Sequence, residues 1–324
     1  MKTITLNTKT LKDRISNVST FAVVVTCWVI MLIVFSCLSP YFFRFNNLMN
    51  LAQYCSVAGV AACGFMLVIL SGFLDLSVGM VSALSAVYAA RAVQITDNWW
   101  FGILIGVATG AVCGCINGVL VTKMKVNPLI ATLGTNSIFQ GIANLENRAV
   151  GIPIYNDQFK FFGQGYIIGG KVPVIVVIMA ISFIVFHIIL TYTKFGREVY
   201  SVGGNAHASY VSGINVDKVR FKIFLICSIM CGFSGVLFAA LTGTGIPTAN
   251  INLSMDSTSA TILGGASLSG GRGKIIGTVV GVLMMATITN GLTILGVSTF
   301  YQMIARGAIL LVAVYLDSLK GQSG

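Results

Sequence analysis

Apolar runs of about 20 residues recur along the whole chain, separated by short polar segments. As a helix rising about 1.5 Å per residue, each run is long enough to cross about 30 Å of hydrocarbon. The strict alternation typical of a membrane β-barrel strand is absent. Hydrophobic residues make up 56% of the 324 and charged residues only 9%, a balance that no water-soluble domain of this size carries. The sequence therefore predicts an all-α, polytopic integral membrane protein.

The runs predict about ten membrane-spanning helices, one or two of them broken or re-entrant. We expect them at 20–38, 47–70, 76–94, 99–121, 127–147, 172–193, 221–242, 256–270, 275–294 and 299–317. They form one transmembrane domain over 20–317, between an N-terminal tail (1–19) and a C-terminal tail (318–324). A polar segment that includes 194–220 interrupts this domain.

The distribution of Lys and Arg predicts the orientation. With the N-terminus in the cytoplasm, four basic residues of the first tail and ten others, 14 of the 20 in the chain, fall on the inner side. Cytoplasmic loops carry such an excess, so both termini and the polar segment are predicted to be cytoplasmic. The net charge of +11 then reflects orientation in the bilayer rather than binding of nucleic acid.

Two places in the apolar pattern are unsuited to a plain spanning helix. The run from Asp256 to Gly270, rich in Ser, Thr and Gly, would cover only about 22 Å as a helix, which is short of the hydrocarbon thickness. Small residues and one carboxylate also interrupt the run at Ser71–Gly79. Such backbone survives at membrane depth only beside protein or water. We therefore expect broken or re-entrant helices that line a cavity.

The polar segment carries the signals of a short capped helix. Gly203-Gly204 predicts a chain break, Asn205 is a good N-cap, Ala206–Ser212 allows about two turns, and Gly213 suits the left-handed C′ position. A simple turn between two spans needs only a few residues. This segment is therefore predicted to be a cytoplasmic docking surface for a second protein.

The sequence carries no energy-converting chemistry of its own. Gly273-Lys274 is followed by Ile275, and position 268 is Leu, so the phosphate-binding GxxxxGK[ST] pattern is absent. A proton or ion relay needs several ionisable groups at membrane depth, each costing at least about 2.5–3.5 kcal/mol, and the spans have almost none. We therefore predict neither an enzyme nor an ion-coupled pump, with no cofactor and no metal site. Energy for uphill transport would come from a partner.

The spans do contain amides and hydroxyls, which suit a path for a neutral, hydroxylated solute. The candidate pathway residues are Asp75, Asn117, Thr132, Thr135, Asn136, Thr258, Ser259, Gly264, Gly265 and Asn290. Small and polar residues also let membrane helices pack closely, and Asp75 also suits the cap of a helix end. Both interpretations remain open for these positions.

Five segments in a consistent order carry a family resemblance. They are Ser71–Gly79 (SGFLDLSVG), Asn117-Gly118, Asn127–Thr135 (NPLIATLGT), Phe195–Asn205 (FGREVYSVGGN) and Ile262–Lys274 (ILGGASLSGGRGK). Through these segments the sequence resembles, over most of its length, the membrane permease subunits of bacterial ABC importers for monosaccharides, of the ribose, arabinose, xylose and galactose type.

The resemblance implies a ten-helix permease in the bacterial inner membrane. It implies a second permease subunit, here expected to be an identical copy, together with cytoplasmic ATPase subunits and a periplasmic sugar-binding protein. Coupling to the ATPase is expected at Gly196, Arg197, Gly203, Gly204, Asn205, His207, Tyr210 and Gly213. Arg197 also fits the positive-inside rule alone, and the glycines also fit simple turns. After Asn205 this chain has Ala206–Tyr210 (AHASY), where the family tends to have acidic and alanine-rich residues.

The leading hypothesis is thus a monosaccharide permease that works by alternating access. An ABC permease for a polyol or a sugar-like signalling molecule is the nearest alternative. A stand-alone secondary carrier, driven by a gradient and needing no ATPase, is a second one.

Overall fold

The computed structural model describes residues 20–321, which are mostly helical. The long helices are α2 (Thr20–Leu38), α3 (Phe45–Leu70), α4 (Val78–Thr96), α5 (Trp99–Thr122), α6 (Pro128–Glu146), α8 (Val174–Tyr192), α11 (Val216–Thr242), α13 (Ile275–Ile294) and α14 (Thr299–Gly321). The shorter helices and strands are β1 (Ile152–Pro153), α7 (Asp157–Gln164), β2 (Tyr166–Ile167), β3 (Val172–Pro173), α9 (Lys194–Gly204), α10 (Ala206–Val211), β4 (Thr244–Gly245) and α12 (Leu253–Leu263).

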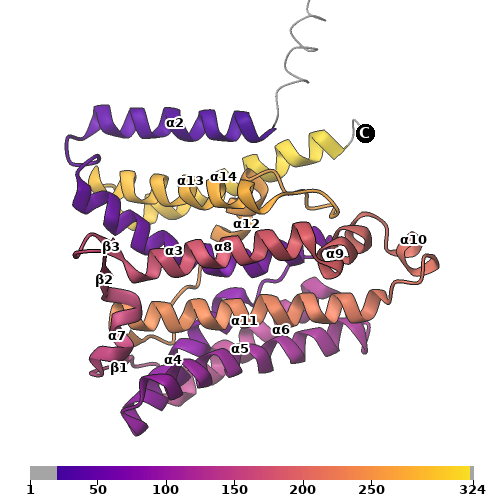
Figure 1. The fold of residues 1–324 in the computed structure, drawn as a ribbon, viewed down its shortest axis with the longest axis horizontal. Helices are drawn as coiled ribbons and strands as arrows, with labels where there is room; N and C mark the ends of the chain where they lie inside the picture. The colour runs from indigo at the N-terminus through magenta and orange to yellow at the C-terminus, as the bar shows by residue number, and fades with distance from the viewer. Residues whose placement is uncertain (1–19, 322–324) are drawn as a thin grey trace, which may run out of the picture.

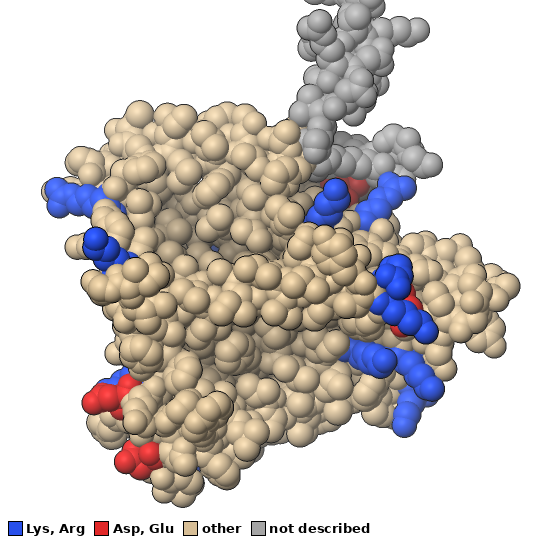
Figure 2. Space-filling view, viewed as in Figure 1, with Lys and Arg blue, Asp and Glu red and all other residues tan. Residues whose placement is uncertain are grey.

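The helices run side by side, with the connecting elements gathered at the two ends of the bundle (Figure 1). Helices α9 and α10 lie at one end, whereas α7 and strands β1, β2 and β3 lie at the other. On the face drawn in Figure 2, charged side chains also gather at the two ends and leave a broad uncharged band between them. A band of this kind is what a surface facing hydrocarbon requires.

Within residues 20–321, seven helices are long and apolar enough to cross a membrane: α2, α3, α4, α5, α8, α11 and α13. Helix α14 contains a shorter apolar stretch, Thr299–Tyr315. The predicted all-α, polytopic membrane protein agrees with this architecture. The three further predicted spans coincide with α6, α12 and α14, which do not meet this criterion of length and composition.

Helix α11 packs against α3, α4 and α5 through small residues. A Cβ added to Gly110 or Gly114 of α5 would overlap α11 at Ser228, and one added to Gly235 of α11 would overlap Ser82 of α4. Hydrocarbon gives little hydrophobic drive for helix association, so close backbone contact is what holds such helices together. At these positions the small residues serve packing.

Helix α12 is an interrupted element, as predicted for this part of the chain. After β4, which pairs antiparallel with β1, residues 246–252 are not helical and reach the start of α4, where Asn250 Nδ2 donates to Ser82 Oγ at 2.9 Å. Helix α12 has 11 residues, or about 16 Å. Residues 264–274 after it are again not helical. Non-helical backbone therefore flanks α12 on both sides.

Two boundaries differ from the sequence-based expectation. Gly203 and Gly204 do not break the chain, because α9 continues through Gly204 and ends at Asn205. Close backbone packing, described below, explains the glycine at 203. Helix α14 runs to Gly321 and thus into the predicted C-terminal tail. The predicted N-terminal tail (1–19) lies outside the described residues.

Candidate functional site

A cavity of about 770 Å³ lies between α3, α12, α13, α14 and the non-helical segment before α12. It occupies the half of α3 nearest Phe45, the end of the bundle that carries α7 and β1–β3 (Figure 1). Its polar lining consists of Asn47, Asn50, Tyr54, Thr248, Asn250, Asn252, Asp256, Ser257, Thr289, Asn290, Thr293 and Arg306. Small-molecule sites have volumes of roughly 300–1,000 Å³, so this cavity has room for a small solute and its hydration shell.

One wall of the cavity is built on a reciprocal amide pair. Asn47 Nδ2 donates to Asn290 Oδ1 at 2.9 Å, and Asn290 Nδ2 donates to Asn47 Oδ1 at 3.0 Å. Asn47 also donates to the Phe42 carbonyl at 2.8 Å. These bonds join the start of α3 to the last turns of α13. Asn290, a predicted pathway residue, thus lines the cavity in a fixed orientation.

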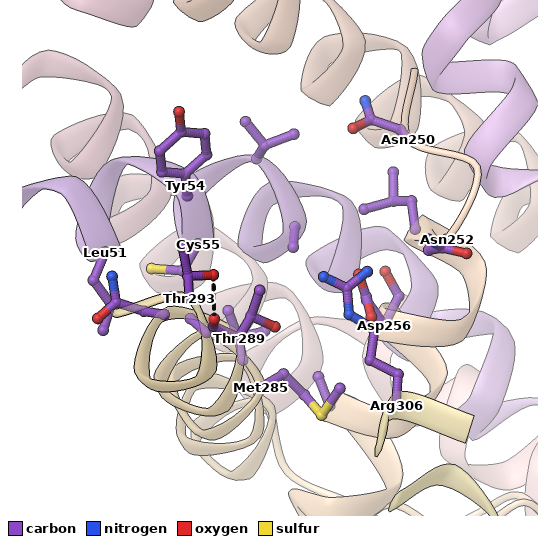
Figure 3. A pocket seen from close by; sticks show the side chains of 18 of the residues that line it. Leu51, Tyr54, Cys55, Asn250, Asn252, Asp256, Met285, Thr289, Thr293 and Arg306 are labelled. Atoms are coloured by element: carbon purple, nitrogen blue, oxygen red, sulfur yellow. Dashed lines mark hydrogen bonds and ion pairs between the residues drawn. The ribbon is translucent and has the colours of Figure 1, made fainter. Parts of the chain in front are cut away.

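The opposite wall carries the cavity's two charges. Arg306 Nη1 of α14 lies 3.8 Å from Asp256 Oδ2 of α12, with side chains 23% and 25% exposed. In Figure 3 these two side chains lie beside each other, below Asn250 and Asn252 and across from Tyr54. A distance of 3.8 Å gives electrostatic attraction but is too long for a hydrogen bond. The pair is therefore charge-balanced but loosely joined.

Asp75, Asn117, Thr132 and Thr135 come together elsewhere, in a buried network. Asp75 Oδ1 accepts from Ser77 N at 2.8 Å and from Ser77 Oγ at 2.6 Å. Asn117 Nδ2 donates to Ser77 Oγ at 2.8 Å, and Thr135 Oγ1 donates to Asn117 Oδ1 at 2.7 Å. Thr132 Oγ1 accepts from Leu76 N at 3.2 Å. All four predicted residues therefore anchor the non-helical link between α3 and α4.

This network lies outside the lining of the cavity. Its bonds satisfy the backbone N–H groups of Leu76 and Ser77, the Ser77 hydroxyl and one oxygen of Asp75, as irregular backbone at membrane depth requires. For these residues the geometry favours the structural interpretation that the sequence left open.

The other predicted pathway residues also differ in their surroundings. Thr258 and Ser259 are buried within α12, and Thr258 Oγ1 donates to Ser254 O at 2.6 Å. Gly264 packs on the backbone of Gly277, whereas Gly265 adopts φ +90° in the turn after α12. Asn136 is half-buried on α6. Asn290 alone among the predicted pathway residues, all of which the structure describes, lines the cavity.

Sequence reasoning missed most of the polar lining. Asn47 and Asn50 belong to the first turns of α3, and Asn250 and Asn252 precede the run predicted as a span. Asp256 stood at the predicted edge of that span. One signal was available: Arg306 is a charge inside an apolar run, and such a residue needs a partner or a water-filled space.

At the end of the bundle where α9 and α10 lie, these two helices form a protruding pair (Figure 1). Asn205 Oδ1 caps α10 by accepting from Ala208 N at 2.9 Å, as predicted, and Gly213 adopts φ +84°. Ser201 Oγ and Ser209 Oγ bond at 2.8 Å and fix α10 on α9. The N-cap prediction is confirmed.

The predicted coupling residues divide into two groups. Exposed residues, free to contact a partner, are Arg197, Gly204, Asn205, His207, Tyr210 and Gly213. Tyr210 is 70% exposed although it is an aromatic side chain. Gly196 is buried against the end of α8, and the half-buried Gly203 packs against the end of α3. These two glycines serve packing, whereas the exposed residues form a surface.

Helix α9 contacts the last residue of α3 and the non-helical segment after α12. A Cβ at Gly203 would overlap the carbonyl oxygen of Leu70, the last residue of α3, and that oxygen accepts from Gly271 N at 2.8 Å. Tyr200 Oη donates to Gly273 O at 2.8 Å. Burial raises the pKa of Tyr200, which favours the protonated phenol that donates this bond. A movement of α9 would thus reach the end of α3 and residues 264–274 directly.

Comparison with known proteins places the chain in a family. The family model for the permease component of a branched-chain amino acid transport system matches residues 47–314. The chain is 38% identical over 294 residues to the ribose import permease protein RbsC of Bacillus subtilis (strain 168), which covers 90% of each chain. It is 34% identical over 283 residues to the L-arabinose transport system permease protein AraH of Escherichia coli (strain K12), covering 87% of this chain and 85% of that one.

No solved structure matches the chain. The family match extends from the third residue of α3 into α14 and so includes the cavity, both non-helical interruptions and the α9–α10 pair. This chain therefore belongs to the family of transport-system permease components that the model describes.

Proposed function

We propose that this chain is the membrane permease subunit of a bacterial ABC importer, and that it moves a monosaccharide inward by alternating access. The observation that carries the proposal is the cavity lined by amides and hydroxyls, in a chain that is 38% identical to a ribose permease and 34% identical to an arabinose permease. Amides and hydroxyls exchange hydrogen bonds between water and sugar at little net cost. The subunit is a transport component and not an enzyme.

The proposed topology has ten crossings, with α6, α12 and α14 added to the seven long apolar helices. Both termini and the α9–α10 pair then lie on the cytoplasmic side of the bacterial inner membrane. The Lys and Arg residues near α9 and the start of α11, among them Lys194, Arg197 and Lys218, support this orientation. The cavity then faces the outer half of the bilayer.

Coupling is proposed to act through the exposed face of α9 and α10. A cytoplasmic ATPase docks on this surface, and its closure displaces α9. Because Gly203 and Tyr200 touch Leu70 and Gly273, the displacement reaches the ends of α3 and of the α12 segment. Close-packed backbone transmits such a shift with little loss. The two interruptions are the flexible places where the cavity opens to one side and then to the other.

Two further partners complete the proposed importer. A sugar-binding protein binds at the outer end of the bundle. There, residues 147–173 form the longest external connection, which contains α7 and three short strands. A second copy of this chain is expected beside the first. Apolar side chains exposed on the outside of the bundle, such as Leu104 and Ile138, face either that copy or lipid.

The test is uptake by the complete importer in proteoliposomes, with ATP inside and the binding protein outside. D-ribose or L-arabinose is expected to enter, whereas ribitol and L-leucine are not. Uptake of ribitol with exclusion of both sugars would favour the polyol alternative. Uptake of L-leucine alone would overturn the sugar assignment.

A further inference from the structure

The charged wall of the cavity holds an unusual concentration of unpaired polar atoms. Among the described residues, Asp256 Oδ1, Ser257 Oγ and Arg306 Nε are buried side-chain atoms without a hydrogen-bond partner in the protein. All three residues line the cavity. Buried polar atoms are nearly always satisfied, so a cluster of exceptions on a cavity wall needs an explanation, and a bound solute or water is one.

The geometry of the ion pair leaves both charges able to bind. Arg306 Nη1 and Asp256 Oδ2 are 3.8 Å apart, beyond the 2.7–3.2 Å of a protein N–H···O hydrogen bond. Asp256 can therefore accept, and Arg306 can donate, toward a third group. A vicinal diol does both, because each hydroxyl donates one hydrogen bond and accepts others. Bonds to charged groups are roughly twice as strong as neutral ones.

The charge balance restricts the kind of solute. In the described lining the one carboxylate faces the one guanidinium, so the two charges largely cancel. A phosphorylated or acidic sugar would bring a charge that nothing there neutralises, and burying an unpaired charge is costly. An amino acid would need to separate the pair to satisfy its ammonium and its carboxylate. A neutral polyhydroxylated solute needs neither change.

We propose that Asp256 and Arg306 form the solute-binding element of this cavity, and that their mutual neutralisation makes the permease select neutral sugars over charged ones. This inference rests on the proposed transport function and adds a binding site and a selection rule within the permease itself. Asn250 and Asn252, which lie above the pair (Figure 3), supply further amide contacts to the same solute.

The experiment uses the full chain in nanodiscs, without the ATPase or the binding protein. Thr289, across the cavity, is replaced by Cys, and its modification by a membrane-impermeant maleimide is followed by peptide mass spectrometry. D-ribose is expected to slow the modification in a saturable way. D-ribose 5-phosphate, D-glucosamine and L-leucine are expected to have no such effect.

Two variants test the selection rule. Asp256→Asn leaves Arg306 without its counter-charge, so protection by D-ribose should weaken about tenfold, the effect of losing one charge-assisted bond, while D-ribose 5-phosphate begins to protect. Arg306→Gln should weaken protection by D-ribose to a similar extent and allow D-glucosamine to protect. A merely structural pair would not invert the preference for charge.

The chain offers a matched control in Arg91–Glu146, an ion pair at 2.9 Å with similarly exposed side chains (28% and 25%) that is not among the cavity's lining residues. Arg91→Gln and Glu146→Gln are expected to leave the protection profile unchanged. If Asp256→Asn or Arg306→Gln does not fold, the double variant Asp256→Asn/Arg306→Gln removes both charges together. The double variant should weaken protection by D-ribose, and neither D-ribose 5-phosphate nor D-glucosamine should protect.

The inference is overturned if D-ribose fails to protect position 289, if L-leucine protects it instead, or if the single variants keep the wild-type preference for charge. None of these outcomes depends on ATP or on a partner. Failure of the transport assay with intact protection in nanodiscs would instead count against the importer function.

Discussion

The backbone of Gly203 lies directly against the carbonyl oxygen of Leu70, in a gap with no room for a Cβ. Gly203 belongs to the predicted docking element and Leu70 ends α3, whose first half lines the cavity, so this contact joins the two functional regions. The same carbonyl accepts a bond from Gly271 N, which adds the segment after α12. One small contact therefore links α9 to the end of α3 and to the segment after α12.

Replacing Gly203 with Ala should force α9 away from α3. Overpacking of this kind costs typically about 1–3 kcal/mol, so the Tm of the purified chain should fall, and sugar delivered per ATP hydrolysed should fall with it. Gly134→Ala is the matched control, because nothing lies within 4 Å of a Cβ there. Equal behaviour of the two variants would remove the proposed mechanical role of Gly203.

Asn205→Ala should loosen α10 without unfolding the bundle. The lost bond to Ala208 N is an N-cap, which contributes about 1 kcal/mol to its helix. Hydrogen exchange at the Ala208 amide should speed up, and the ATPase should bind less tightly. Asn205→Ser keeps a capping oxygen and should restore both. If Asn205→Ala leaves the exchange rate unchanged, the cap does not hold α10.

Tyr210→Ala tests the docking surface itself. The side chain is 70% exposed, so its removal should leave the Tm unchanged. A buried aromatic at an interface carries at least about 1.4 kcal/mol, or tenfold in Kd, and ATPase binding to the permease in detergent should weaken by that much. Tyr155→Ala, an exposed tyrosine near the opposite end, should bind the ATPase normally. Unaltered binding by Tyr210→Ala would place the ATPase elsewhere.

Asn117→Ala should lower stability, because it leaves Ser77 Oγ and Thr135 Oγ1 each one bond short in a buried site. The expected loss is about 1–3 kcal/mol. Thr135→Val should lower the free energy of unfolding less in the Asn117→Ala variant than in the wild type, since both changes break the same bond. Chemical denaturation of the four proteins in detergent measures this coupling. Strictly additive losses would mean that the network is not a unit.

Local features of this fold were predictable from residues close together in the chain. Apolar runs mark the long helices, and Asn205 followed by small residues marks a capped turn. The interruption near Asp256 followed from a run too short and too polar to span. These predictions depend on hydrogen bonds and burial within single segments, which sequence pattern reports directly.

The solute-binding side of the cavity was not predictable in the same way. Asp256 and Arg306 are 50 positions apart and meet because α12 packs on α14. Asn117 and Asn290 are both amides in apolar runs, yet one belongs to a packed network and the other lines the cavity. The same residue type satisfies buried backbone or faces water, and only the packing of distant helices decides which.

Accumulation of D-ribose against its own gradient tests the central claim most directly. Proteoliposomes containing this chain, with or without its ATPase, receive binding protein and D-ribose outside and ATP inside. Accumulation above the external concentration is expected only with the ATPase present. Accumulation at the same rate without the ATPase would contradict the account, because the permease would then be driving transport by itself.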